Sequence, residues 1–93
     1  MAVLSGQKAV TTAGTAVRLS TGLLINGPVL VKALPSNSAA VYVGNVNGSV
    51  NSTTGLPLAA GEVVVFDQVG NLMELWVDSA VNGEGVAWLG LRL

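Results

Sequence analysis

The sequence contains no cysteine and no histidine. A chain without cysteine cannot form a disulfide framework. The absence of both residue types also excludes a Cys/His metal site, and a nucleophilic site with a Ser-His or Cys-His pair, built from this chain alone. Only five carboxylate side chains remain for other chemistry. We therefore expect a non-enzymatic protein with no catalytic, cofactor-binding or metal-binding residues.

Charge is also scarce. Charged residues make up 10% of the chain, and the formal net charge is −1, whereas about a quarter of the residues in a typical soluble domain are charged. Four basic residues do not supply the cationic surface with which proteins neutralise nucleic-acid phosphates. The sequence therefore predicts no nucleic-acid partner.

Long hydrophobic runs are missing, although 51% of the residues are hydrophobic. Apolar stretches such as residues 63–66 end within a few residues at a polar residue, a glycine or a proline. A membrane-spanning helix needs about 20 consecutive apolar residues. The first eight residues also lack the basic region and the apolar core of a signal peptide. We expect a chain that neither enters a membrane nor carries an export signal.

The apolar residues that are present form short runs separated by turn signals, which is typical of an all-β protein. Asn-Gly pairs such as Asn47-Gly48 and Asn82-Gly83, and the Asn26-Gly27-Pro28 triplet, suit tight turns because they tolerate positive φ angles. The 93 residues make one domain, residues 1–93. We predict a small antiparallel β-sandwich or jelly roll of about seven to eight short strands, with residues 1–6 as a candidate flexible N-terminal arm. The expected strands are residues 8–10, 16–20, 29–34, 40–44, 62–67, 74–79 and 86–93.

Residues 45–61 break this pattern, because they are polar and contain no clear strand before Leu56-Pro57-Leu58. Loops of this length in compact domains are usually functional or mobile. The alternative is a decorated hairpin that contains an extra short strand. Both interpretations stay open at the level of sequence.

Alternation along the expected strands assigns side chains to faces, because successive residues of a strand point to opposite sides. Trp76 alternates with Leu75 and Val77 and falls on the face that carries charge. In residues 87–93 the aliphatic row is Ala87, Leu89, Leu91 and Leu93, and Trp88 falls in the other row with Gly90 and Arg92. We predict that the tryptophans lie on outward faces; the alternative is a register error of one residue, which would make them core residues.

A two-layer sandwich buries one face of each sheet and leaves the other to water. Exposing several large apolar side chains favours association, because burial of each is worth roughly 1.5–3 kcal/mol. We therefore predict a homo-oligomer, or a protein docked on a larger assembly. The residues expected at the oligomer or capsid interface are Leu30, Leu34, Tyr42, Trp76 and Trp88.

The residues are compatible with two other classes of function. Tryptophans, a tyrosine and many asparagines on a β-sandwich are also the parts of a carbohydrate-binding site. The carboxylates lie at strand ends and turns, as on a solvated surface, although a glycosidase-like pair or a calcium loop over residues 78–84 are alternatives. The five carboxylates are Glu62, Asp67, Glu74, Asp78 and Glu84.

Four segments carry a resemblance to a known group of proteins: residues 31–37 (VKALPSN), 41–45 (VYVGN), 54–62 (TGLPLAAGE) and 75–78 (LWVD). Their order is similar to that in the small β-structured virion proteins of tailed bacteriophages. Such proteins serve as capsid decoration (cement) proteins or as head-fibre and tail-associated modules. The resemblance covers residues 29–93, about two-thirds of the chain.

The resemblance implies a non-enzymatic structural protein that is made in the host cytoplasm and ends on the capsid surface of the virion. It also implies a homo-oligomer, with a trimer favoured, and the major capsid protein or other virion proteins as partners. The alternative function is a receptor- or glycan-binding β module of a phage fibre or tail, with residues 45–61 and an aromatic platform as its site.

Overall fold

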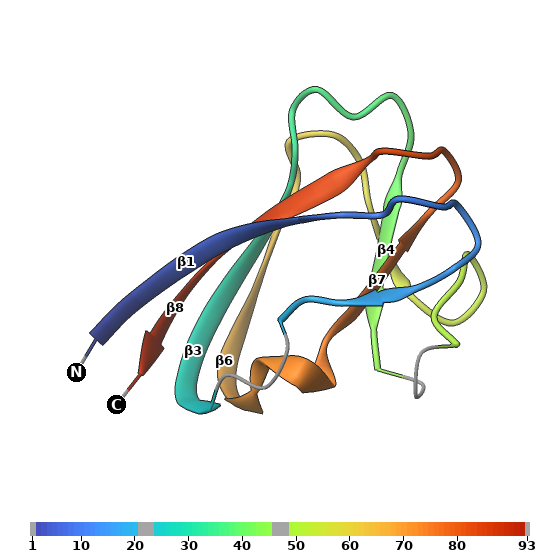
Figure 1. Cartoon of the computed structure of the whole chain (residues 1–93). Helices are drawn as coiled ribbons and strands as arrows, with labels where there is room; N and C mark the ends of the chain where they lie inside the picture. Colours follow the sequence, from blue (N-terminus) through green and yellow to red (C-terminus); the bar gives the residue numbers. More distant parts are fainter. Residues whose placement is uncertain (1, 21–23, 46–48, 93) are drawn as a thin grey trace.

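The computed structural model describes residues 2–20, 24–45 and 49–92, and in them the chain is all-β apart from one turn of 3-10 helix (Figure 1). The eight strands form two antiparallel four-stranded sheets. This confirms the predicted all-β class and the predicted number of strands. The elements are β1 (Ala2–Ala9), β2 (Val17–Arg18), β3 (Leu24–Ala33), β4 (Val41–Gly44), β5 (Leu56–Leu58), β6 (Val63–Asn71), η1 (Leu72–Glu74), β7 (Trp76–Ser79) and β8 (Gly85–Arg92).

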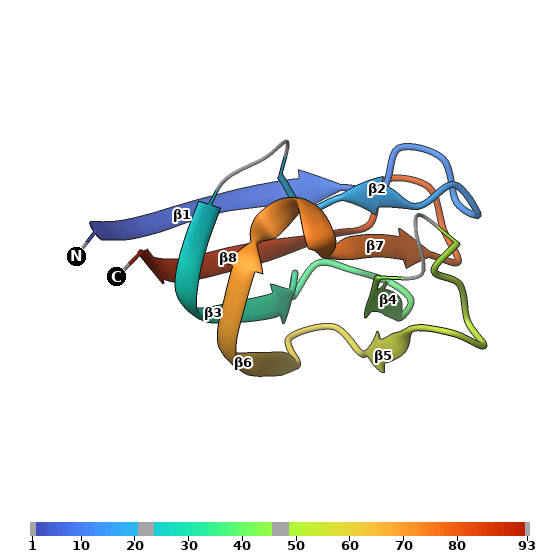
Figure 2. The ribbon, with the colours of Figure 1, turned by 90° about the horizontal axis from the view of Figure 1, so that it is seen from below.

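The first sheet has the strand order β1-β8-β3-β6, and the second has the order β2-β7-β4-β5. Figure 2 shows the first sheet at the end of the molecule where β1 begins and β8 ends, and the second sheet at the other end. The strand pairing is nested along the chain: β1 pairs with β8, β2 with β7, β3 with β6 and β4 with β5. None of the described residues belongs to a helix long and apolar enough to cross a membrane.

One hydrophobic core joins the inner faces of the two sheets. Val29 and Val31 of β3 are buried against Val41 of β4 and Val77 of β7 in the same cluster. Their neighbours Leu30, Tyr42 and Trp76 are partly exposed. The predicted rows of these three strands are therefore correct.

Strand β3 is longer than predicted, because the expected turn at residues 26–28 lies inside it. Asn26 has a positive φ of 49°, and the pairing with β6 shifts register on both sides of Gly27. These shifts are β-bulges, which accept a left-handed residue and a proline without ending the strand. The prediction of a chain reversal at Asn26-Gly27-Pro28 is therefore wrong. These residues bend the strand and do not end it.

The expected N-terminal arm is also wrong for the residues that the structure describes. Residues 2–6 are the first part of β1, which pairs with β8 without interruption from Ala2 opposite Arg92 to Ala9 opposite Gly85. Leu4 packs against the core, and Gly6 faces the indole of Trp88. Strand pairing and apolar contact therefore hold this segment in the first sheet.

The face assigned to β8 is wrong. Trp88 is 9% exposed and belongs to the core, with Val86 and Gly90 in the same buried row. Leu89 and Leu91 point outward instead. Because the side-chain period of a strand is two, an error of one residue exchanges its faces completely. Trp88 is consequently no candidate for the surface that we describe below.

The polar segment 45–61 contains the extra short strand of the alternative interpretation. Leu56–Leu58 forms β5 and pairs with β4, with Pro57 opposite Tyr42. Residues 51–54 form a turn in which the side-chain carbonyl of Asn51 accepts hydrogen bonds from Thr53 and Thr54. The predicted turn at Asn47-Gly48 lies outside the described residues.

Candidate functional site

The outer face of the first sheet is aliphatic. Val3 is 68% exposed, Val65 60% and Leu89 46%. A contiguous patch of exposed apolar side chains is unusual on a protein surface, and such patches mark interaction sites. We call this surface the aliphatic face and define it by Val3, Leu30, Val63, Val65, Leu89 and Leu91.

Strand register makes the aliphatic face continuous across all four strands. Leu30 on β3 is opposite Leu89 on β8 and opposite Val65 on β6. Val3 on β1 is opposite Leu91. Directly opposite residues have Cβ atoms about 4.5–5.5 Å apart, so these side chains touch or nearly touch. Between them lies a shallow hollow of about 200 Å³, lined by Pro28, Val29, Leu30, Val65, Leu89 and Leu91.

Charge is confined to the ends of the aliphatic face. Lys32 follows Leu30 in the outward row of β3, and Asp67 follows Val65 in the outward row of β6, at the other end of the strands. The central row across the sheet is Ser5, Leu89, Leu30 and Val65, which carries no charge. A partner placed on this face would therefore meet mainly hydrocarbon.

The outer face of the second sheet has a different chemistry. Tyr42 on β4 is opposite Asp78 on β7, and Trp76 on β7 is opposite Arg18 on β2. The guanidinium carbon of Arg18 lies 5.0 Å from the centroid of the Trp76 ring, which is cation–π distance. The ring of Trp76 therefore already has a partner in its own chain.

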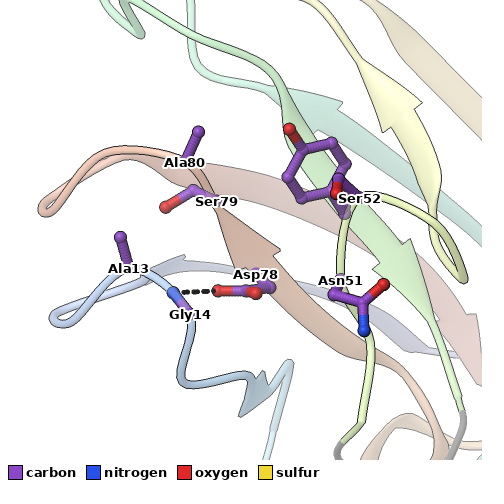
Figure 3. Close-up of a pocket in the computed structure, with 8 residues that line it drawn as sticks. Ala13, Gly14, Asn51, Ser52, Asp78, Ser79 and Ala80 are labelled. Carbon is purple, nitrogen blue, oxygen red and sulfur yellow. Dashed lines mark hydrogen bonds between the residues drawn. The ribbon is translucent and has the colours of Figure 1, made fainter.

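Beside Tyr42 the second sheet bears a hollow of about 340 Å³, which is lined by both polar and apolar groups (Figure 3). Asp78 is only 3% exposed, and its Oδ1 atom accepts a hydrogen bond of 3.0 Å from the backbone N–H of Gly14. The hollow joins the end of β7, the segment after β1 and the turn at residues 51–54. Its lining residues are Ala13, Gly14, Tyr42, Asn51, Ser52, Asp78, Ser79 and Ala80.

The five residues predicted at the interface do not form one surface. Leu30 lies in the aliphatic face, whereas Tyr42 and Trp76 lie on the outside of the second sheet. Leu34 follows β3, and its backbone N–H donates a hydrogen bond of 3.1 Å to the carbonyl of Gly85. Trp88 is in the core.

Most of the aliphatic face was missed from the sequence. Residues 63–65 are three consecutive valines, so alternation does not say which of them point outward. Leu89 and Leu91 were assigned to the inner row. A signal that could have located them is Gly6, because a glycine in β1 leaves space for an aromatic ring on the strand beside it.

Glu84 has a structural position that the sequence did not indicate. Its Oε1 atom accepts hydrogen bonds from the Ser38 N–H at 2.6 Å, the Ser38 hydroxyl at 2.7 Å and the Ala39 N–H at 2.9 Å. The pKa of Glu84 is lowered below its ordinary 4.5, mainly because of the hydrogen bond from the Ser38 hydroxyl. Burial acts in the opposite direction and raises the pKa, whereas the two backbone hydrogen bonds lower it further. Next to it, the Asn37 side chain exchanges two hydrogen bonds with the backbone of Gly85. These contacts fasten the segment between β3 and β4 to the start of β8.

Within the described ranges, no three side chains of the histidine, cysteine or carboxylate types gather in a cluster that could hold a metal ion. Neither the protein-family models nor the curated proteins give a match to this chain.

Proposed function

We propose that the chain is a non-enzymatic structural protein of a tailed-phage virion, namely a capsid decoration (cement) protein. It forms a homo-oligomer through the aliphatic face, and the resemblance to small virion proteins favours a trimer. The observation that carries the proposal is the unbroken row Leu89–Leu30–Val65 across the outside of the first sheet.

The occupant of the aliphatic face is a second copy of the chain. Strands of eight residues, as in β1 and β8, at about 3.3 Å per residue and four strands about 4.8 Å apart give a face of about 500 Å². Two such faces in contact bury about 1,000 Å², which is about the smallest total area of a specific protein–protein interface. In a trimer, three such faces around the threefold axis would bury about 1,500 Å² in total.

The absence of charge from the central row supports an apolar contact. Burial of each large aliphatic side chain contributes roughly 1.5–3 kcal/mol, and no buried charge has to lose its hydration there. Lys32 and Asp67 remain at the two ends of the face, where charges usually form the rim of an interface.

The nested strand pairing supports the virion assignment by analogy of fold. It is the arrangement expected of a jelly roll, and viral capsid domains commonly use this fold. Lectins use it too, and fold alone does not define function. In the proposal the oligomer sits on the capsid surface and contacts the major capsid protein.

Multi-angle light scattering tests the oligomer directly. We expect the wild-type chain to be oligomeric at micromolar concentration and Leu89→Lys to be monomeric. Val81→Lys is the matched control, because Val81 is 43% exposed, much like Leu89 at 46%, but lies in the connection between β7 and β8. A monomeric wild type, or equal effects of both substitutions, would contradict the proposal.

The virion assignment has its own test. Phage particles purified from a host that carries the gene are analysed by quantitative mass spectrometry. We expect the chain in many copies per particle, and loss of it from particles made with the Leu89→Lys variant. Particles without the wild-type chain would refute a structural role in the virion.

A further inference from the structure

The hollow on the second sheet lies on the other side of the fold from the aliphatic face and is independent of the proposed assembly. Among the described residues that line it, Asp78, at 3% exposure, is the one with a charged side chain. Removing a carboxylate from water without a cation nearby is unfavourable. The Asp78 carboxylate accepts a hydrogen bond from the Gly14 N–H, and no lysine or arginine is among the described residues that line the hollow.

A tyrosine is the cross-strand neighbour of the same aspartate. Tyr42 is directly opposite Asp78 in the β4–β7 ladder, so their Cβ atoms lie about 4.5–5.5 Å apart. Both residues line the hollow, and Figure 3 shows the Asp78 carboxylate turned toward Gly14. A carboxylate beside a ring attracts a positive charge, because both the anion and the face of the ring are electron-rich.

Other polar groups around the hollow are already engaged. The side-chain carbonyl of Asn51 accepts hydrogen bonds from Thr53 and Thr54. The hydroxyl of Ser79 donates to the carbonyl of Val81. A saccharide would need several free donors and acceptors at once, whereas a cation needs chiefly the carboxylate and the ring.

We propose that the hollow formed by Asp78, Tyr42 and Ser52 binds an ammonium or guanidinium group. The chain's own arginine on this sheet, Arg18, is held over Trp76, so the cation comes from outside the chain. It is either the basic side chain of another protein or a small free cation.

Titrations of the full ¹⁵N-labelled chain followed by NMR test the proposal, with the amide of Gly14 as the reporter. The probes are methylammonium, methylguanidinium, and five-residue peptides with a central lysine, arginine or norleucine. We expect the cations and the basic peptides to shift the Gly14 and Ser52 signals, and the norleucine peptide to leave them unchanged. Tighter binding of the basic peptides identifies a protein side chain as the source, and equal binding identifies a small cation.

Matched variants complete the test. Asp78→Asn retains an oxygen for the Gly14 N–H but lacks the charge, and we expect binding to weaken about tenfold or more, because a hydrogen bond to a charged group is worth about 1.5–3 kcal/mol. Asp67→Asn makes the same change of charge on the first sheet and should leave binding unchanged. Tyr42→Leu retains the carboxylate and should weaken binding severalfold even if Asp78→Asn does not fold.

Three results would overturn the proposal. The first is no shift with any cationic probe while the wild-type chain is folded. The second is equal binding by wild type and a folded Asp78→Asn. The third is binding of neutral monosaccharides with no response to the cations, which would make the hollow a glycan site. None of these results bears on the oligomer, which light scattering measures separately.

Discussion

Gly6 and Trp88 are directly opposite each other in the β1–β8 ladder, and the indole occupies the space beside the glycine. A Cβ atom on residue 6 would stand 2.9 Å from Cζ2 of Trp88 and 3.0 Å from its Nε1. Such contacts are closer than van der Waals packing allows, so the absence of a side chain at position 6 is what admits the ring to the core.

Gly6→Ala should therefore destabilise the fold. The indole would have to move within a packed core, and overpacking of this kind typically costs about 1–3 kcal/mol. Urea unfolding followed by tryptophan fluorescence measures the change. Ser5→Ala, one residue away on the outward side of the same strand, is the control and should change the free energy of unfolding by less than about 0.5 kcal/mol. Equal stability of Gly6→Ala and wild type would contradict the packing described.

The Glu84 carboxylate should make stability depend on pH in the acid range. Its folded-state pKa is lowered from the ordinary 4.5, so the ionised form is favoured by folding. The contribution is complete above about pH 4.5 and is lost as the pH falls through the lower folded-state pKa. Urea midpoints measured from pH 7 to pH 2.5 should show this loss.

The variant Glu84→Gln isolates that contribution. It should be less stable than wild type at pH 7 and should show a smaller decrease between pH 4.5 and pH 2.5. Asp67→Asn removes an exposed carboxylate and should retain the decrease of the wild type. A Glu84→Gln profile parallel to that of the wild type would show that the three hydrogen bonds to Ser38 and Ala39 do not favour the charged form.

Assembly through the aliphatic face should be insensitive to salt. Screening acts on charges, and the Debye length falls from about 10 Å at 0.1 M to about 3 Å at 1 M salt. The central row of the face holds no charged side chain. Light scattering in 0.1 M and 1 M sodium chloride should give the same mass, and dissociation at moderate salt would argue for a polar interface elsewhere.

The Arg18–Trp76 pair should contribute modestly to stability. A cation–π contact at a partly exposed site is worth about 0.5–1 kcal/mol. A double-mutant cycle with Arg18→Gln and Trp76→Leu measures the coupling energy in urea unfolding. A coupling of zero would mean that the 5.0 Å approach has no energetic consequence.

Strands were predictable where the sequence distinguishes their two faces. In β3 the outward row includes Lys32 and the inward row is Val29, Val31 and Ala33, so the buried side follows from alternation. In β8 both rows contain large apolar residues, and alternation has no preference between them. Leu89 and Leu91 are as hydrophobic as the core residues, so the sequence pattern of β8 predicts the wrong row as the buried one.

The candidate site was predictable only in outline. The sequence predicts exposed apolar side chains that favour association, and it correctly places Leu30 on an outward face. Tyr42 and Trp76 were also placed outward, but they lie on the second sheet and so do not join Leu30. The grouping of residues across strands depends on pairing partners that are far apart in the chain, such as Leu30 with Leu89.

Composition and local pattern were thus sufficient to predict the all-β class, to exclude Cys/His chemistry and to find most of the strands. They were insufficient for the sidedness of β8 and for the neighbours of each strand. Gly6 leaves space for the ring of Trp88, and Gly90 leaves space for the Cδ1 atom of Ile25. Because of these two glycines, the row of β8 that contains Trp88 and Gly90 can pack against the core. That choice is made by the fit of side-chain volumes across strands, and no segment of the chain carries this information in isolation.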